Sequence, residues 1–191
     1  MLNPSLRPVE GRVYTDEFRV YGVFHLRANT GTAWLLNAED RPHLPLTHVS
    51  MYRPGVAHPP GSEALAYETH FAAIPKASIV WMQGGAPDSG QEGMGRQPRQ
   101  VYLVYPTYVV TGTFQMRAEV RLSDFIGSAM AAKPFVTLHE ARILGAGSRG
   151  QSFAELPTIQ SHDFITVNLR NVGGIFDLRG GDPAKAYVAE E

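Results

Sequence analysis

Histidines are the residues of this sequence best suited to chemistry, because imidazole binds metal ions and moves protons near neutral pH. A zinc site needs three or four such ligands converging at about 2 Å. His43 and His48 flank one expected strand, and His139 lies in a later one. No two histidines have the four-residue spacing that places both on one face of a helix. We therefore expect no metal site and no cofactor, and His43, His48 and His139 remain as the candidates to inspect.

Motifs for nucleophilic and phosphate chemistry are also missing. Ser123 and Asp124 have side chains that hydrolases use, but the Gly-x-Ser-x-Gly turn is absent and helix capping accounts for both residues. The glycines of segment 145–150 precede no expected helix, which a phosphate-binding turn requires. Because no catalytic set can be assembled, the sequence favours a protein that is not an enzyme.

The composition excludes several classes of partner. The formal net charge is -1, with 17 basic and 18 acidic residues, so no basic excess favours nonspecific binding to nucleic acid or anionic membranes. Cysteine is absent, which excludes disulfides and thiolate metal sites. The N-terminus has no apolar run of signal-peptide length, and no segment reaches the ~18 apolar residues that span a bilayer. We expect a soluble cytoplasmic protein with no membrane contact.

The chain contains two related segments. Three blocks of the first half recur in the same order in the second half, at offsets that grow from 90 to 93 residues. The blocks are 18–28 with 108–118, 44–49 with 136–141, and 71–79 with 164–172. The first pair shares a glycine, a phenylalanine two residues later and an Arg-Ala dipeptide. Such collinear similarity predicts two diverged copies of one unit.

A glycine-rich segment separates the copies. Residues 82–99 contain five glycines and two prolines, a composition typical of flexible coil. We therefore predict a first β unit at residues 10–82, a linker at 83–99, a second β unit at 100–180 and a flexible tail at 181–191.

Each copy reads as about five short strands and one short helix. Residues 134–144 alternate between apolar and polar side chains with the period of a half-buried strand. The helix is expected at residues 32–39 of the first copy and 121–130 of the second, and Gly112 inside a strand predicts a bulge or sharp bend. We expect a mostly β protein, made of two tandem small barrel-like units that pack face to face about a pseudo-twofold axis.

The second copy carries Arg-Leu-Ser-Asp-Phe-Ile at residues 121–126 and closes on Val167-Asn168. In these segments the chain resembles a family of small bacterial domains with an Arg-Leu-Ser-Asp helix and a closing Val-Asn strand, here in two tandem copies. The first copy departs from the pattern, with Gly31-Thr32-Ala33-Trp34 and Ile74-Pro75 at these places. The resemblance implies no known activity.

More loosely, the layout resembles the Sm-like small barrel: a bent strand with a central glycine, a short link, two further strands joined by a hairpin, and a closing strand. Sm-like proteins often assemble into rings and bind RNA. The Arg-Gly signature that closes that family is replaced here by residues 167–171.

Five polar residues are candidates for ligand binding. Arg27 and Arg117 recur at equivalent places, which suggests a pair of anion contacts, although a charge on an edge strand also discourages unwanted pairing. Arg121 and Asn168 belong to the segments that carry the family resemblance, and Arg170 belongs to segment 167–171, which stands in place of the Sm-like closing signature.

Three functional hypotheses follow. The leading one is a non-catalytic binding or assembly module with a protein partner or self-association, because strand edges tend to pair. The second is an Sm-like nucleic-acid binder, which the charge does not support. The third is a small-molecule or metal site between the two units.

Overall fold

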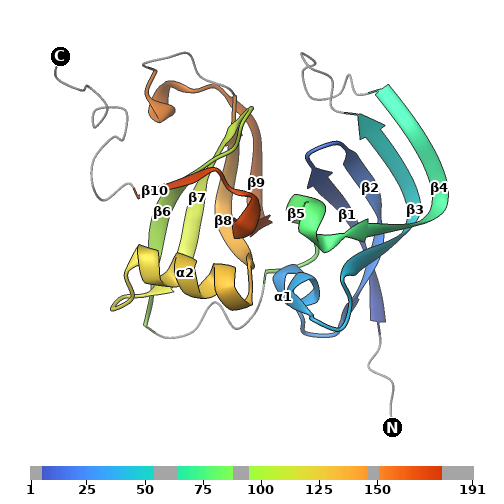
Figure 1. The fold of residues 1–191 in the computed structure, drawn as a ribbon, viewed down its shortest axis with the longest axis horizontal. Helices are drawn as coiled ribbons and strands as arrows, with labels where there is room; N and C mark the ends of the chain where they lie inside the picture. Colours follow the sequence, from blue (N-terminus) through green and yellow to red (C-terminus); the bar gives the residue numbers. More distant parts are fainter. Residues whose placement is uncertain (1–5, 54–63, 88–94, 146–150, 178–191) are drawn as a thin grey trace, which may run out of the picture.

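The computed structural model describes residues 6–53, 64–87, 95–145 and 151–177. These form one open antiparallel sheet of ten strands in the order β10-β6-β7-β8-β9-β5-β1-β2-β3-β4, with two α-helices (Figure 1). The strands are β1 (Leu6–Thr15), β2 (Arg19–Arg27), β3 (His43–Arg53), β4 (Ala64–Pro75), β5 (Ile79–Gly84), β6 (Arg96–Val104), β7 (Val109–Arg117), β8 (Phe135–Leu144), β9 (Thr158–Asn168) and β10 (Gly174–Asp177). The helices are α1 (Thr32–Asn37) and α2 (Leu122–Ala132), with 3-10 turns η1 (Lys76–Ser78), η3 (Phe153–Glu155) and η4 (Leu169–Asn171).

The expected mostly β class is confirmed, but the arrangement differs from two barrels packed face to face. The sheet is open, and the strands β1–β5 (the first half) meet the strands β6–β10 (the second half) edge to edge. Both helices lie at the same end of the molecule (Figure 1). No helix in the described ranges has the length and hydropathy to cross a membrane.

The two halves have the same element order: strand, strand, helix, strand, strand, 3-10 turn and strand, with η3 as an extra turn in the second half. Their strand registers also correspond. Val13 pairs with Met82 in the first half, and Leu103 pairs with Ile175 in the second. These positions are related by offsets of 90 and 93 residues, which are the offsets found in the sequence.

The bulge predicted at Gly112 is present. The β7–β8 register shifts between Thr111 and Thr113, and the β2–β3 register shifts at the corresponding place around Gly22. In the facing strands, His48 and Glu140 both have a φ of 51°, a left-handed conformation that is uncommon for residues other than glycine. Both halves therefore bend at the same point of the second and third strands.

The hydrophobic cores of the two halves are interlocked. Trp81 of β5 and Tyr14 of β1 stack with their ring centroids 3.5 Å apart, and both belong to the buried cluster of the second half. Phe135 of β8 is in turn buried in the cluster of the first half. Each half therefore covers apolar surface of the other.

The two halves are joined by main-chain pairing between β5 and β9 and by hydrogen bonds from asparagine side chains to the backbone of the other half. Met82 of β5 pairs with Thr166 of β9. The Asn168 Nδ2 donates to the Ile79 carbonyl oxygen at 3.0 Å. At the helix end, the Asn37 Nδ2 donates to the Phe135 carbonyl at 2.7 Å, and its Oδ1 accepts from the Phe135 N–H at 3.0 Å.

The predicted linker is shorter than expected. Strand β5 continues to Gly84 and β6 begins at Arg96, so both ends of segment 83–99 belong to the sheet. Residues 88–94 of the linker and the predicted tail at 181–191 lie outside the described residues.

Candidate functional site

The three histidine candidates do not converge. His43 begins β3 beside α1 and lines one hollow of the surface, whereas His48 lines another. The ring of His48 lies 6.5 Å from that of His70, not beside His139. His139 pairs with Phe164 within β8 and β9. In the part of the chain that the structure describes, no three histidine or acidic side chains are grouped to hold a metal ion.

Two of the candidate ligand-binding residues contact the protein's own backbone. Asn168 is buried, and its Oδ1 accepts from the Arg170 N–H at 3.1 Å while its Nδ2 holds β5. The Arg170 Nε donates to the Met130 carbonyl at 2.8 Å near the end of α2. These contacts assign both residues a structural role that sequence reasoning missed.

The helix cap also differs from expectation. Arg121 is the N-cap residue of α2, and no side-chain hydrogen bond caps this helix end, so neither Ser123 nor Asp124 is the cap. Asp124 instead lies exposed in the first turn, where a carboxylate is favoured by the helix dipole.

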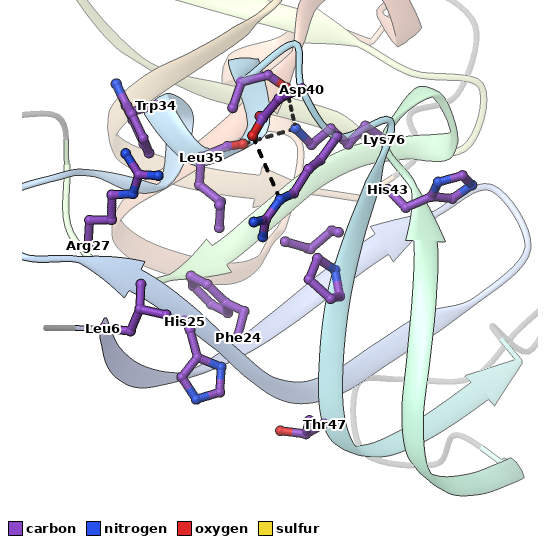
Figure 2. Close-up of a pocket in the computed structure, with 14 residues that line it drawn as sticks. Leu6, Phe24, His25, Arg27, Trp34, Leu35, Asp40, His43, Thr47 and Lys76 are labelled. Atoms are coloured by element: carbon purple, nitrogen blue, oxygen red, sulfur yellow. Dashed lines mark hydrogen bonds and ion pairs between the residues drawn. The ribbon is translucent and has the colours of Figure 1, made fainter. Parts of the chain in front are cut away.

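A hollow of about 530 Å³ lies between α1 and strands β2 and β3; we call it the α1 hollow (Figure 2). Its buried floor includes Phe24 and Leu44. Figure 2 shows Arg27 and Trp34 together on one side and Lys76 beside Asp40 on another. The volume is in the range of sites that bind small molecules or side chains of a partner.

The rim of the α1 hollow carries three cations, Arg27, Arg41 and Lys76, against one carboxylate, Asp40. The Arg27 guanidinium lies 5.4 Å from the centre of the Trp34 ring, and the Arg41 Nε lies 3.8 Å from the Asp40 Oδ2. Positive charge therefore dominates this rim.

Lys76 is the buried member of these cations. Its Nζ donates to the carbonyl oxygens of Leu35 at 3.0 Å and Ala38 at 2.7 Å. These bonds give hydrogen-bond partners to carbonyl groups at the C-terminal end of α1. Burial lowers the pKa of Lys76, and the neighbouring Asp40 opposes that shift. The bonds to Leu35 and Ala38 make Lys76 a structural residue of α1.

A second hollow, of about 750 Å³, occupies the equivalent place beside α2; we call it the α2 hollow. Arg117 and Lys133 line it at the positions that Arg27 and Arg41 hold in the first half. The recurrence of Arg27 and Arg117 was the one sequence signal for these paired hollows. Arg121, the remaining candidate, lies exposed at the start of α2.

The two hollows differ in which halves of the chain supply their lining residues. The α2 hollow is lined by its own half and also by segment 29–37 of the first half, including Trp34 and Asn37. Every described residue that lines the α1 hollow belongs to the first half. The α2 hollow is therefore lined from both sides of the junction, whereas the α1 hollow has no lining residue from a second unit among the described residues.

The outer strands of the sheet are the other candidate surface. Among the described residues β4 pairs only with β3, and β10 pairs only with β6. Strand β4 has 12 residues and exposes Leu65, Tyr67 and Phe71 at 51%, 52% and 58%. A long edge strand with exposed apolar side chains is a surface prone to pairing.

Comparison with known proteins adds no assignment, since no family model, curated protein or solved structure matches this chain. The functional argument therefore starts from the two open sheet edges and the paired hollows.

Proposed function

We propose that this chain is a non-catalytic assembly module whose copies associate head to tail, with β10 of one copy adding to β4 of the next. The observation that carries the proposal is the pairing of β5 with β9 inside the chain. Strand β5 is the fifth strand of its half and β9 is the fourth strand of the other half. The two strands at the open edges are again a fifth strand, β10, and a fourth strand, β4.

The internal register specifies the contact between copies. Met82 of β5 faces Thr166 of β9. At the offset of 93 residues that relates the halves, Met82 corresponds to Ile175, and Thr166 corresponds to Ala73. The proposed contact therefore sets Ile175 of one copy against Ala73 of the next, in an antiparallel pair.

A duplicated unit with an Sm-like layout is part of this proposal. In each half the strand order is fifth, first, second, third, fourth, and the registers of the two halves correspond. A head-to-tail contact uses two different surfaces, so repeated association produces a closed ring or an open chain of copies. The exposed apolar residues of β4 support the same surface.

Native mass spectrometry over a range of protein concentrations tests the assembly. We expect oligomers whose population rises with concentration. Ala73→Lys places a charge on the exposed edge of β4 and should shift the protein to monomer while its circular dichroism spectrum stays unchanged. The matched control is Ser161→Lys, also exposed but on the internal strand β9, which should leave the oligomers intact.

A protein that stays monomeric at every concentration would contradict the proposal. So would an Ala73→Lys variant that is folded and assembles as well as the Ser161→Lys control.

A further inference from the structure

We propose that the α1 hollow is the socket for the start of α2 from a second copy of this chain, with the carboxylates of Glu119 and Asp124 facing Arg27 and Arg41. This inference rests on the proposed head-to-tail assembly. It names a second contact surface, separate from the strand edges.

The internal junction supplies the template. Where β5 meets β9, segment 29–37 of the first half lines the α2 hollow. Asn37 is anchored there by its two hydrogen bonds to the Phe135 backbone. The first half supplies its fifth strand, β5, to the junction, and its helix segment also lines the hollow of the second half.

The same rule identifies the covering segment between copies. When β10 of one copy pairs with β4 of the next, the second half of the first copy supplies the fifth strand. By analogy with the internal junction, the helix segment of that half, at the start of α2, then lies at the α1 hollow of the next copy. At the offset of 90 residues, segment 29–37 corresponds to segment 119–127. Within that segment, Asp124 takes the place of Trp34.

The charges of the two surfaces are complementary. The socket presents Arg27, Arg41 and the largely satisfied Lys76 against Asp40. The segment 119–127 of the second copy presents the exposed side chains of Glu119, Arg121 and Asp124, which together carry a net negative charge. Opposite charges on facing surfaces speed encounter and select the register.

The two helices also differ in how deeply their residues are buried. Helix α1, which lies at the internal junction, buries Thr32, Ala33 and Leu36. Helix α2 is longer, yet none of its residues is fully buried. A second copy seated on the start of α2 covers the face that is left exposed in a single chain.

One substitution makes the contact between copies weaker than the internal one. Gly127 stands where the first half has Asn37, so the two side-chain bonds to the facing backbone are missing between copies. Charge pairs at the surface are screened by salt, with a Debye length of about 8 Å at physiological ionic strength. We expect a reversible contact that weakens as salt is added.

A charge exchange tests the socket. Asp124→Arg alone and Arg41→Glu alone should each weaken association about tenfold in analytical ultracentrifugation, because each sets like charges against one another. The chain that carries both substitutions should recover most of the affinity, since every contact between copies then pairs Glu with Arg. Asp163→Arg, the same charge change at an exposed position of β9, should have no effect.

Tryptophan fluorescence reports on the socket itself. Trp34 is 44% exposed at the rim of the hollow, whereas Trp81 is 2% exposed. Iodide should quench Trp34 in dilute protein and quench it less as copies associate. The Trp34→Phe variant should show little quenching at any concentration.

The outcomes separate this inference from the assembly on which it rests. A protein that never associates overturns both. Oligomers that respond to Ala73→Lys, but not to Asp124→Arg or Arg41→Glu, keep the strand pairing and overturn the socket. Protection of Trp34 that Asp124→Arg leaves unchanged means that another segment occupies the hollow, and it also overturns the socket.

Discussion

At the scale of single residues, polar side chains that suggested ligand binding turn out to hold the chain's own backbone. Asn168 bonds β5 and Arg170 bonds the end of α2. A peptide carbonyl attracts an amide or a guanidinium as a polar ligand does, so residue type alone does not separate the two roles. The position of Asn168 at the end of a strand is compatible with either role until the partner strand is known.

Two buried tyrosines make the folded state sensitive to alkali. Burial raises the pKa of Tyr105 well above its ordinary value, and it also raises the pKa of Tyr108 although the hydrogen bond from Trp81 opposes the shift. Among the described residues the Tyr105 hydroxyl has no hydrogen-bond partner. Folding therefore favours the neutral phenols.

The sign of the pH dependence follows from these raised pKa values. Stability is fully present below pH 10, near the tyrosine pKa in the unfolded chain, and is lost as pH rises toward the folded pKa values. Lys76 acts in the opposite sense, because burial lowers its pKa, but it is one group against three, since burial raises the pKa of Tyr14 as well. We expect the free energy of unfolding, measured with urea, to fall steeply above about pH 10.

Tyr105→Phe is the variant that checks this dependence. It keeps the ring stacked on Tyr108, 4.9 Å between centroids, and removes only the unpartnered hydroxyl. Stability at pH 7 should be unchanged or higher, and the alkaline loss should be less steep by about 1.4 kcal/mol per pH unit. An unchanged slope would contradict the assigned role of Tyr105.

At the scale of elements, the paired glycines of the two bent strands differ in how closely they are packed. A Cβ on Gly112 would lie 2.7 Å from the Leu138 Cγ and 2.8 Å from the His139 carbonyl oxygen. A Cβ on Gly22 would lie no closer than 3.2 Å from its nearest neighbour, the Thr47 carbonyl oxygen. The second half therefore tolerates less added volume at this point.

This difference predicts unequal effects of the same substitution. Gly112→Ala should destabilise the protein by about 2 kcal/mol, as overpacking of a filled site does, and Gly22→Ala should cost clearly less. Thermal unfolding of the two variants beside the wild type measures both. Equal losses would mean that the bend, not the close approach of Leu138, determines the cost.

The elements themselves were largely predictable, because their signals are local. The repeated blocks, the alternation in β8 and the glycine of the bent strand indicated the strands and their order. The strand residues 96–99 were not predicted, since Arg96, Gln97, Pro98 and Arg99 have weak strand preference. They are held in the sheet by pairing with β7, which is a long-range contact.

At the scale of the whole molecule, the sequence predicted two units but not how they join. The pairing of β5 with β9 is short, and no local pattern marks it. One signal was present: Trp81 of β5 corresponds to Gly174 of β10, so only β5 carries a large ring at this position. That ring is buried in the core of the second half, which is why β5 is internal and β10 lies at an edge.

The paired hollows also belong to this scale. Each is bounded by a helix and two strands that are separate in the sequence, so only folding brings their lining residues together. Recurrence of Arg27 as Arg117 indicated an equivalent site in both halves, but it did not show that segment 29–37 of the first half lines the hollow of the second half.

A disulfide trap tests the head-to-tail contact most directly, because the chain has no cysteine of its own. Residues 73 and 175 lie on the two opposite edge strands of the sheet, so a bond between them can form only between copies (Figure 1). The Ala73→Cys/Ile175→Cys chain should form covalent multimers on mild oxidation, because facing residues of antiparallel strands have Cβ atoms about 5 Å apart. The Ser161→Cys/Ile175→Cys control, with Ser161 on the internal strand β9, should remain monomeric on a denaturing gel. If the first variant stays unlinked while the protein is oligomeric, β10 does not add to β4 and the account is wrong.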